Sequence, residues 1–394
     1  MKILFIANRF PYPPYRGDKL KIYNLAKQLY KKHDLYLITF IQDKSDYQYI
    51  EQLNVFFKEI RIIYLPKYLS VLKCIVNLFS QKPFQVIYFK SKKFEKLLNS
   101  FISETEFDVI HTQHLRMSQY SHNLSGVKRI LDLPDAYSLY WKRRSNLKMN
   151  IFQKIFDSYE YKKILNYEKI IKLFDLNLVC SDEDKSVLVS THKIDNINIL
   201  PNGVDISTFV CGEHDYSIKD RIIFTGNMDY SPNVDAVIYF TKEIFPEIIK
   251  KFPEVKFYIV GQKPVKKVLD LQSENVIVTG FVESISDEYN RSSVAVSPIR
   301  FGAGTLNKVL EPMSMGIPVV STEIGFKGLG INSGEGVILA NSREEFTKTV
   351  IQLLESKVMR ETVGKQGIKV IENNFSWVSI SKKLEGYFES LVNK

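Results

Sequence analysis

Two residues in the C-terminal third of the chain, Lys308 and Glu311, have the types and spacing that could do chemistry. They stand three positions apart, so in a helix they lie one turn apart on the same face. A Gly-rich stretch, residues 302–304, precedes them, and Thr305 can cap a helix that starts there with free, anion-binding amides. The pattern predicts a nucleotide-sugar site, in which the ammonium contacts phosphate and the carboxylate accepts ribose hydroxyls.

A second group of polar residues falls in the N-terminal half. Gly17 and Asp18 end a Pro- and Tyr-rich loop and begin a helix, and the ten-residue length of that loop favours a ligand role over a simple turn and N-cap. Gln113 and His114 follow a short apolar run, residues 108–111, at the strand end where α/β domains bind ligands. A structural role for His114 is an equally good interpretation.

The elements that must position these residues follow one pattern twice. Short β-branched runs alternate with segments of helical periodicity, which predicts doubly wound α/β domains with buried parallel sheets. The expected strands of the first half are residues 2–7, 35–40, 61–65, 108–111, 129–133, 176–180 and 198–201. Those of the second half are residues 221–225, 256–260, 276–279, 294–298 and 317–321, with a helix over 233–250 after the first of them.

This pattern also sets the domain boundaries. We predict a first domain over 1–203, a linker over 204–219, a second domain over 220–375 and a closing helix over 376–394. The linker lacks periodicity. The closing helix carries apolar residues at helical spacing, so it is expected to pack on another element.

The composition limits the classes of partner. The chain has 394 residues, of which 45% are hydrophobic, enough for the cores of two domains, and its formal net charge is +10. This charge suits nucleic acid, an anionic membrane or a negatively charged substrate. Nucleic acid is the least favoured, because the sequence has no RNA-binding or zinc signature and its lysines are dispersed. We expect no nucleic-acid partner.

Cysteine usage and hydropathy address the compartment. The three cysteines are far apart and odd in number, as expected for reduced thiols of a cytoplasmic protein. No run of eighteen apolar residues occurs, and the first apolar run is too short for a secretory signal, so we expect neither a transmembrane span nor a leader.

One segment, residues 68–79, is apolar along one side. Five lysines follow it: Lys82, Lys90, Lys92, Lys93 and Lys96. An apolar stripe beside lysines can lie on an anionic membrane. A helix that packs in the core with a solvated basic face is at least as good an interpretation.

Several other site types are disfavoured. Residues 302–304 lack the third glycine of a dinucleotide fingerprint, and no P-loop or G-x-S-x-G elbow occurs. Residues 181–184 read SDED and contain the D-x-D pattern that holds a divalent metal in some sugar transferases. Ser181 is better interpreted as an N-cap, with the acids as partners of the helix dipole. We expect no metal and no cofactor.

Several runs of sequence together carry a resemblance. In the C-terminal half they are NKVLEPMSMGIPVVST (307–322), IIFTGNMDYSPNVDAV (222–237), FYIVG (257–261) and VTGFVES (278–284), together with ILPNGVD (199–205) and FSW (375–377). They resemble the retaining glycosyltransferases of family four, among the glycosyl transferases group 1. FPYPPYRGDKLKIYNLAKQL (10–29) is similar to a sugar-transferase subgroup associated with exosortase and PEP-CTERM loci.

The resemblance implies a GT-B fold, with two Rossmann-like domains facing a cleft and a final helix that crosses back to the first domain. It implies that Lys308 contacts the donor pyrophosphate and Glu311 the ribose, while Gly304 and Thr305 offer amides to phosphate. The remaining donor-side positions that it implies are Gly17, Gly226, Asn227, Gly261, Phe281, Val282, Arg300 and Asn307.

The chain departs from the family pattern at several positions. Ala303 stands where a carboxylate near the sugar is often found, and Leu306 and Asn227 stand where arginines are common. Donor phosphates would therefore depend on Arg300, Lys308 and helix amides. The family's N-domain histidine near the sugar falls at Gln113, with His114 one place later, so the catalytic set implied is His114, Lys308 and Glu311.

The function that the resemblance implies is retaining transfer of a hexose from a nucleotide-diphosphate sugar, by default a UDP-sugar, to a glycan or lipid-linked acceptor of capsule, O-antigen or exopolysaccharide synthesis. The basic surface suits a peripheral position on the anionic inner face of the plasma membrane. The candidate acceptor-side residues are Asp18, Lys19, Gln113, Asp135, Trp141 and Arg143.

Two alternatives stay open. A nucleotide-sugar epimerase can share the GT-B fold. Ala303 and Leu306 also leave room for a non-catalytic paralogue that binds nucleotide.

Overall fold

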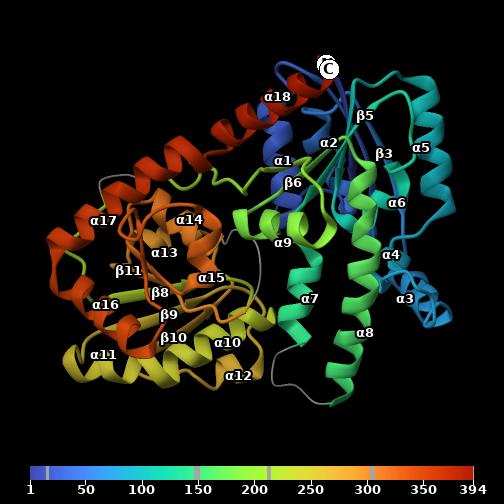
Figure 1. Ribbon diagram of the computed structural model, residues 1–394. Coiled ribbons are helices and arrows are strands. Elements are labelled where there is room, and N and C mark those ends of the chain that lie inside the picture. Colours follow the sequence, from blue (N-terminus) through green and yellow to red (C-terminus); the bar gives the residue numbers. More distant parts are fainter. Residues whose placement is uncertain (15–16, 146–150, 211–213, 302–306, 394) are drawn as a thin grey trace. The chain divides into compact units, whose positions relative to one another are not determined.

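A computed structural model describes residues 1–14, 17–145, 151–210, 214–301 and 307–393. The chain divides into two compact units. Unit 1 comprises Met1–Asn202 together with Ile380–Lys394, and unit 2 comprises Gly203–Ser379, so that residues 204–219, the expected linker, are part of unit 2. Each unit contains one parallel sheet flanked by helices (Figure 1), which confirms the predicted doubly wound α/β class.

Unit 1 is built on a seven-stranded sheet of order β3-β2-β1-β4-β5-β6-β7. Its strands are β1 (Lys2–Ala7), β2 (Asp34–Ile41), β3 (Glu59–Tyr64), β4 (Val109–Gln113), β5 (Lys128–Leu133), β6 (Leu176–Val179) and β7 (Ile197–Ile199). The strand order reverses between β1 and β4. The carboxyl ends of these two strands therefore flank the crevice in which such sheets bind ligands.

The helices of unit 1 cover both faces of this sheet (Figure 1). They are α1 (Gly17–Leu29), α2 (Ile50–Asn54), α3 (Lys67–Val76), α4 (Phe84–Tyr88), α5 (Lys92–Glu104), α6 (Ser118–Ser121), α7 (Tyr137–Ser145), α8 (Ile151–Tyr167) and α9 (Asp182–His192). The described residues also form short 3₁₀ helices at Lys44–Tyr49, Leu115–Met117 and Glu168–Leu173. The apolar side chains that helix α1 buries are Ile22, Leu25, Ala26 and Leu29.

The closing helix α18 (Trp377–Val392) starts in unit 2 and belongs to unit 1 from Ile380 onwards. Ile380, Leu384 and Phe388 are buried. The Tyr387 hydroxyl donates to the Ile199 carbonyl at 3.2 Å. The apolar spacing of the segment thus correctly predicts a packed helix.

Unit 2 is built on a six-stranded sheet of order β10-β9-β8-β11-β12-β13. Its strands are β8 (Arg221–Thr225), β9 (Lys256–Val260), β10 (Val276–Gly280), β11 (Val294–Ser297), β12 (Val319–Ser321) and β13 (Val337–Leu339). The order reverses between β8 and β11, so the second crevice lies at the carboxyl ends of those strands. Alternate residues of β8 enter different cores: Ile222 and Phe224 join one hydrophobic cluster, and Ile223 joins the other.

The helices of unit 2 differ from the prediction in one respect. They are α10 (Ser231–Tyr239), α11 (Phe245–Lys251), α12 (Lys266–Leu269), α13 (Ile285–Asn290), α14 (Asn307–Ser314), α15 (Glu323–Phe326), α16 (Arg343–Glu355) and α17 (Lys357–Val370), with a 3₁₀ helix at Lys327–Leu329 and a π-helix at Ile371–Phe375. The predicted helix over 233–250 is interrupted by a π-helix at Phe240–Ile244. Pro246 follows in the first turn of α11, where its missing N–H costs little.

Two further observations concern the described residues. No helix among them is long and apolar enough to cross a membrane. Cys74 and Cys180, the two cysteines in the described part, form no disulfide, and Cys211 lies outside that part.

Candidate functional site

The Lys308–Glu311 pair lies on α14, as the spacing predicts. Val309, Leu310 and Met313 of this helix are buried in the core of unit 2 and fix its position. Lys308 and Glu311 are only partly buried. Four positions discussed above, Ala303, Gly304, Thr305 and Leu306, lie outside the described residues.

The Lys308 ammonium is held by a neutral partner. Its Nζ donates to Asn233 Oδ1 at 2.5 Å and lies 5.3 Å from the centre of the Phe224 ring. Burial lowers the pKa of Lys308 to about 8, although the nearby Glu311 carboxylate opposes this shift. Because its hydrogen-bond partner is neutral, the ammonium can still attract an anionic ligand.

Asn233, a residue that the sequence analysis did not single out, also fixes a loop. Its Nδ2 donates to the Asn227 carbonyl at 2.9 Å. The Asn227 side chain in turn accepts from Gln262 Nε2 at 2.9 Å. One amide therefore connects α14 to the loop that follows β8.

Glu311 lies in a small polar network with Tyr289 and Thr225. The Tyr289 hydroxyl donates to Glu311 Oε2 at 3.3 Å and lies 2.6 Å from Thr225 Oγ1. Burial raises the pKa of Glu311 to about 7, against the effects of Tyr289 and Lys308. Hydroxyl donors from a ligand would stabilise the carboxylate in this setting.

The glycines Gly226 and Gly261 allow two backbones to approach each other. Gly226 has φ +155° and Gly261 has φ +151°. A Cβ on Gly261 would lie 1.8 Å from the Gly226 carbonyl oxygen, and a Cβ on Gly226 would lie 2.5 Å from Asn233 Nδ2. Close packing of the loops after β8 and β9 thus requires glycine at both positions.

The other donor-side positions have different surroundings. Arg300 binds Asp235 through two hydrogen bonds, of 2.5 and 2.8 Å, and its guanidinium lies 4.6 Å from the centre of the Tyr239 ring. The Phe281 ring, just after β10, is 70% exposed. Val282 packs against the core, and Asn307 is the first residue of α14.

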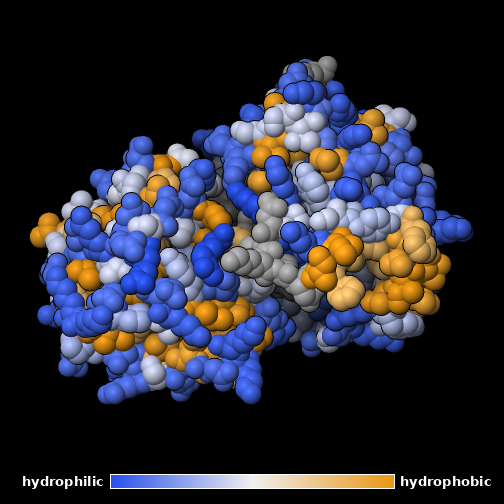
Figure 2. Space-filling view, turned by 60° about the horizontal axis from the view of Figure 1, so that its bottom comes forward, coloured by the Kyte–Doolittle hydropathy of each residue, from blue (hydrophilic) through white to orange (hydrophobic). Residues whose placement is uncertain are grey.

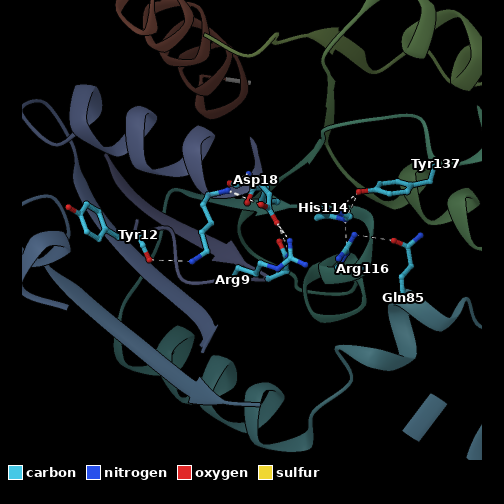
Figure 3. A network of polar contacts seen from close by, with 10 residues as sticks. Arg9, Tyr12, Asp18, Gln85, His114, Arg116 and Tyr137 are labelled. Atoms are coloured by element: carbon cyan, nitrogen blue, oxygen red, sulfur yellow. Dashed lines mark hydrogen bonds and ion pairs between the residues drawn. The ribbon is translucent and has the colours of Figure 1, made fainter. Parts of the chain in front are cut away.

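In unit 1, Asp18 forms the centre of a network at the carboxyl ends of β1 and β4 (Figure 3). Its Oδ2 accepts from Arg9 Nη1 at 2.6 Å, and its backbone carbonyl accepts from Gln113 Nε2 at 2.8 Å. Burial raises the pKa of Asp18, but Arg9 and Arg116 lower this pKa by a larger amount. The net shift is downward, and the carboxylate is ionised.

Two neighbours of Asp18 complete this part of the site. Lys19 Nζ donates to the Tyr12 carbonyl at 3.3 Å. Gly17 begins α1, and a Cβ there would meet nothing within 4 Å. Gly17 is therefore not required by local packing.

His114 is a neutral hydrogen-bond acceptor for Arg116. Arg116 Nε donates to His114 Nδ1 at 2.9 Å, and the Tyr137 hydroxyl lies 2.8 Å from the same nitrogen. Burial, with Arg116 and Arg9, lowers the pKa of His114 well below its usual range. His114 also has φ +84°, a backbone conformation that is uncommon for a non-glycine residue and clusters at functional sites.

Of the remaining acceptor-side positions, the structure brings Asp135 near this network. Burial and the neighbouring Asp184 raise the pKa of Asp135 to about 7, while Arg143 and Arg116 oppose the shift. Arg143 is bound to Glu183 at 2.6 Å, and Trp141 packs edge-on against Phe156.

The D-x-D segment is part of a helix start. Ser181 is the N-cap of α9 and accepts from the Asp184 amide at 3.1 Å. The Asp184 carboxylate accepts from the Ala136 amide at 2.9 Å. In the part of the chain that the structure describes, no group of three His, Cys, Asp or Glu side chains is placed to hold a metal ion.

Arg9 and Arg116 are the polar residues of unit 1 that the sequence analysis missed. Arg9 stands two residues after β1 and Arg116 three residues after β4. Like Gln113 and His114, both arginines lie at strand ends where α/β domains bind ligands, and this position could have identified them in the sequence.

Comparison with known proteins agrees with this geometry. Residues 219–356 match the family model for glycosyl transferases group 1. An uncharacterized 44.6 kDa protein in the cps region of Klebsiella pneumoniae is 24% identical, over 95% of this chain and 96% of its own length. The UDP-Gal:alpha-D-GlcNAc-diphosphoundecaprenol alpha-1,3-galactosyltransferase of Escherichia coli is 22% identical, over 75% of this chain and 79% of its own length.

Solved structures of low sequence identity share the fold. Sucrose-phosphate synthase from Thermosynechococcus elongatus superimposes with a TM-score of 0.74 at 14% identity, over 100% of this chain and 99% of that chain. Anabaena HepE in complex with UDP superimposes with a TM-score of 0.70 at 16% identity, over 99% and 100% of the two chains. The similarity confirms the GT-B fold, while membership of the PEP-CTERM-associated subgroup stays a prediction.

Proposed function

Because the chain carries a glycosyl transferases group 1 domain on a GT-B fold, we propose that it transfers a hexose from a UDP-sugar, with retention, to a lipid-linked glycan in capsule or related surface-polysaccharide synthesis. The observation that carries the donor side is the Lys308–Glu311 pair. Burial shifts the pKa values of both side chains toward their neutral forms, so diphosphate and ribose hydroxyls would stabilise the two charges.

The proposed chemistry depends on cations that are already in place. Departure of the nucleotide diphosphate leaves negative charge, which preorganised donors stabilise because they need no rearrangement during the reaction. Lys308, oriented by Asn233, supplies such a donor. In the proposed mechanism, the acceptor hydroxyl attacks from the face that the diphosphate leaves, and a phosphate oxygen takes its proton. No metal is required.

The lipid-linked acceptor is proposed from the relatives and from a surface of unit 1. The names of two relatives refer to a cps region and to a diphosphoundecaprenol substrate. The structure also corrects one interpretation of residues 68–79: among the residues of α3, only Ser70 is buried, so this helix is not a core helix.

The exposed apolar side chains of α3 continue onto α8. Phe79 is 90% exposed and Phe152 is 82% exposed. The Tyr159 hydroxyl of α8 donates to the Leu78 carbonyl at 3.2 Å, so the two segments lie side by side. We call the result the α3–α8 surface (Figure 2, orange, at the right) and define it by Tyr68, Val71, Leu72, Ile75, Val76, Leu78, Phe79, Ile151, Phe152, Ile155 and Phe156.

The charges around the α3–α8 surface favour an anionic bilayer as its partner. Lys73 of α3 donates to the Lys90 carbonyl at 2.7 Å, which places the lysine-rich start of α5 next to α3. Exposed lysines on and around the surface are Lys67, Lys82, Lys90, Lys92, Lys93, Lys96 and Lys154. An apolar surface with adjacent lysines binds anionic membranes by burial and by charge. We propose peripheral binding to the inner face of the plasma membrane.

A ligand screen followed by a transfer assay tests the function. UDP-sugars should raise the melting temperature of the purified protein, because a ligand that binds only the native state stabilises it. Radiolabelled donor incubated with lipid-linked acceptors should then pass label to the lipid fraction. Conversion of the donor without acceptor would indicate an epimerase instead. Nucleotide binding without transfer or donor hydrolysis would indicate a non-catalytic paralogue.

A further inference from the structure

We propose that Arg9 and Arg116 form a second anion site in unit 1, which binds the phosphate or diphosphate group of the acceptor. The inference rests on the proposed function and adds the chemical group by which the acceptor is recognised. The two basic residues among the acceptor-side candidates have other partners, because Lys19 donates to a backbone carbonyl and Arg143 is paired with Glu183.

The position of the two arginines is that of a ligand site. They follow β1 and β4, the strands between which the sheet order of unit 1 reverses. Both act electrostatically on the Asp18 carboxylate, and Arg9 lowers the pKa of Arg116, so the two guanidinium groups are close in space. Figure 3 shows both arginines beside Asp18 and His114.

The carboxylates near Arg9 and Arg116 do not balance the two positive charges of the guanidinium groups. Arg9 takes the Asp18 carboxylate at 2.6 Å. The hydrogen bonds of Arg116 go to uncharged groups, at 2.9 Å to His114 and 3.3 Å to Gln85 Oε1. Asp135 also lies in electrostatic range, but with a pKa of about 7 its carboxyl carries only part of a charge near neutral pH. The cluster therefore has an excess of positive charge.

Because this excess positive charge is buried, a bound anion would stabilise it. Burial and the neighbouring Arg9 lower the pKa of Arg116 by more than Tyr137 and Asp18 raise it, so the protein compensates the charge of Arg116 only in part. The hydrogen bond from Nε to the neutral His114 orients the guanidinium plane, and the other hydrogen-bond partners of Arg116, Gln85 and Tyr137, are uncharged as well. None of these three partners supplies the negative charge that a phosphate would bring. Paired arginines recognise phosphate oxygens through charge-assisted, often bidentate, hydrogen bonds. The donor diphosphate is assigned to other residues, those around Lys308 in unit 2.

The test measures binding of inorganic pyrophosphate to the full-length protein by calorimetry while UDP saturates the donor site. Farnesyl diphosphate and glucose 1-phosphate serve as second and third probes, to separate a lipid diphosphate from a free sugar phosphate. We expect pyrophosphate to bind the UDP-saturated protein, and farnesyl diphosphate to bind more tightly than glucose 1-phosphate.

Two variants and one control locate the site. Arg116→Gln should weaken pyrophosphate binding about tenfold or more, since a charge-assisted hydrogen bond is lost. Arg9→Gln, at a side chain that is 29% exposed, should weaken binding in the same direction and serves if Arg116→Gln does not fold. Arg129→Gln is the control, because Arg129 is paired with Asp175 near the start of β5, at the other end of the sheet.

Three results would overturn the site. They are an absence of pyrophosphate binding in the presence of UDP, unchanged binding in both arginine variants, and a loss of UDP affinity in Arg116→Gln, which would make Arg116 a donor contact. Pyrophosphate binding that depends on Arg116, in a protein that does not bind UDP, would contradict the proposed function and leave this site standing.

Discussion

Lys308 and Asn233 are joined by a hydrogen bond of 2.5 Å between Nζ and Oδ1. The same asparagine donates to the Asn227 carbonyl at 2.9 Å. A neutral side chain thus orients the cation of α14 relative to the loop after β8. Because Asn233 brings no negative charge, it does not neutralise the Lys308 ammonium, which we propose to contact the donor diphosphate.

Asn233→Ala should therefore lower kcat/KM for the nucleotide-sugar donor, although the substitution does not change the charge of the protein. A hydrogen bond to a charged group is worth about 1.5–3 kcal/mol, so we expect kcat/KM for the donor to fall about tenfold to a hundredfold. Steady-state kinetics checks this value. Asn275→Ala is the matched control, because in the described residues the Asn275 side chain donates only to the backbone carbonyls of Pro253 and Val255, just before β9. Equal losses in the two variants would indicate a general structural effect.

Donor affinity should depend on pH through Glu311 and Lys308. Burial raises the pKa of Glu311 to about 7, so its carboxylate is lost as the pH falls below that value. Burial lowers the pKa of Lys308 to about 8, so its charge is lost as the pH rises above that value. The affinity for UDP-glucose should thus be highest between about pH 7 and 8, as calorimetry from pH 6 to 9 can measure.

Glu311→Gln separates the two limbs of this profile. The variant should lose the decline on the acid side and keep the decline on the alkaline side, because Lys308 is still present. An unchanged acid limb in Glu311→Gln would assign that limb to another group and contradict the role of Glu311.

Membrane binding should depend on the α3–α8 surface. Phe79→Asp and Phe152→Asp each place a charge where the side chain is exposed and apolar, so flotation with vesicles rich in anionic lipid should fall several-fold. Binding of the wild type should also weaken at high salt, since salt screens the lysines. Val55→Asp is the control in the same unit, at a side chain that is 64% exposed and outside this surface. Flotation that ignores both salt and these variants would contradict the proposal.

A buried ion pair in unit 1 should dominate its stability. Lys21 Nζ donates to Asp132 Oδ1 at 2.7 Å, and both side chains are at most 2% exposed. Asp132→Ala would leave the ammonium buried without its partner, which typically costs about 3–5 kcal/mol. Denaturant unfolding measures this loss. Asp34→Ala, which breaks the exposed pair of Asp34 with Lys58, should cost less than about 1 kcal/mol.

The same pair gives stability a defined dependence on pH. Burial raises the pKa of Asp132, but Lys21 and His111 lower this pKa by a larger amount. The folded-state pKa therefore lies below the unfolded-state pKa. The stabilisation is therefore complete above the unfolded pKa of about 3.9 and is lost as the pH falls through the folded pKa. Asp132→Ala should show less acid-dependent loss of stability than the wild type.

The sequence predicts the donor-side helix and, apart from β13, the strands, because local patterns determine them. The predicted runs 221–225 and 256–260 coincide with β8 and β9, and the helix predicted to carry Lys308 and Glu311 is α14. Apolar periodicity and strand-end glycines are readable within short windows.

Contacts between distant segments could not be predicted in this way. Asp132 lies 111 residues from Lys21, and no local pattern indicates that a lysine of α1 is buried. Lys308 and Asn233 are 75 residues apart. Arg300, expected to face phosphate, is bound by Asp235, which follows from how α10 packs rather than from the order of residues.

The exposure of α3 is a similar case. Its periodicity fits both a core helix and a surface helix, because an apolar stripe does not reveal what covers it. Only tertiary structure shows that the stripe is exposed and continues onto α8.

The most direct test of the donor site is UDP binding to Lys308→Ala, measured by calorimetry together with transfer from the UDP-sugar. We expect a folded variant with about a hundredfold or greater loss of transfer and clearly weaker UDP binding, because a preorganised cation at the leaving diphosphate is removed. Lys250→Ala, at an exposed lysine paired with Glu247, should behave as the wild type. Wild-type transfer and UDP affinity in Lys308→Ala would contradict the assignment of this site.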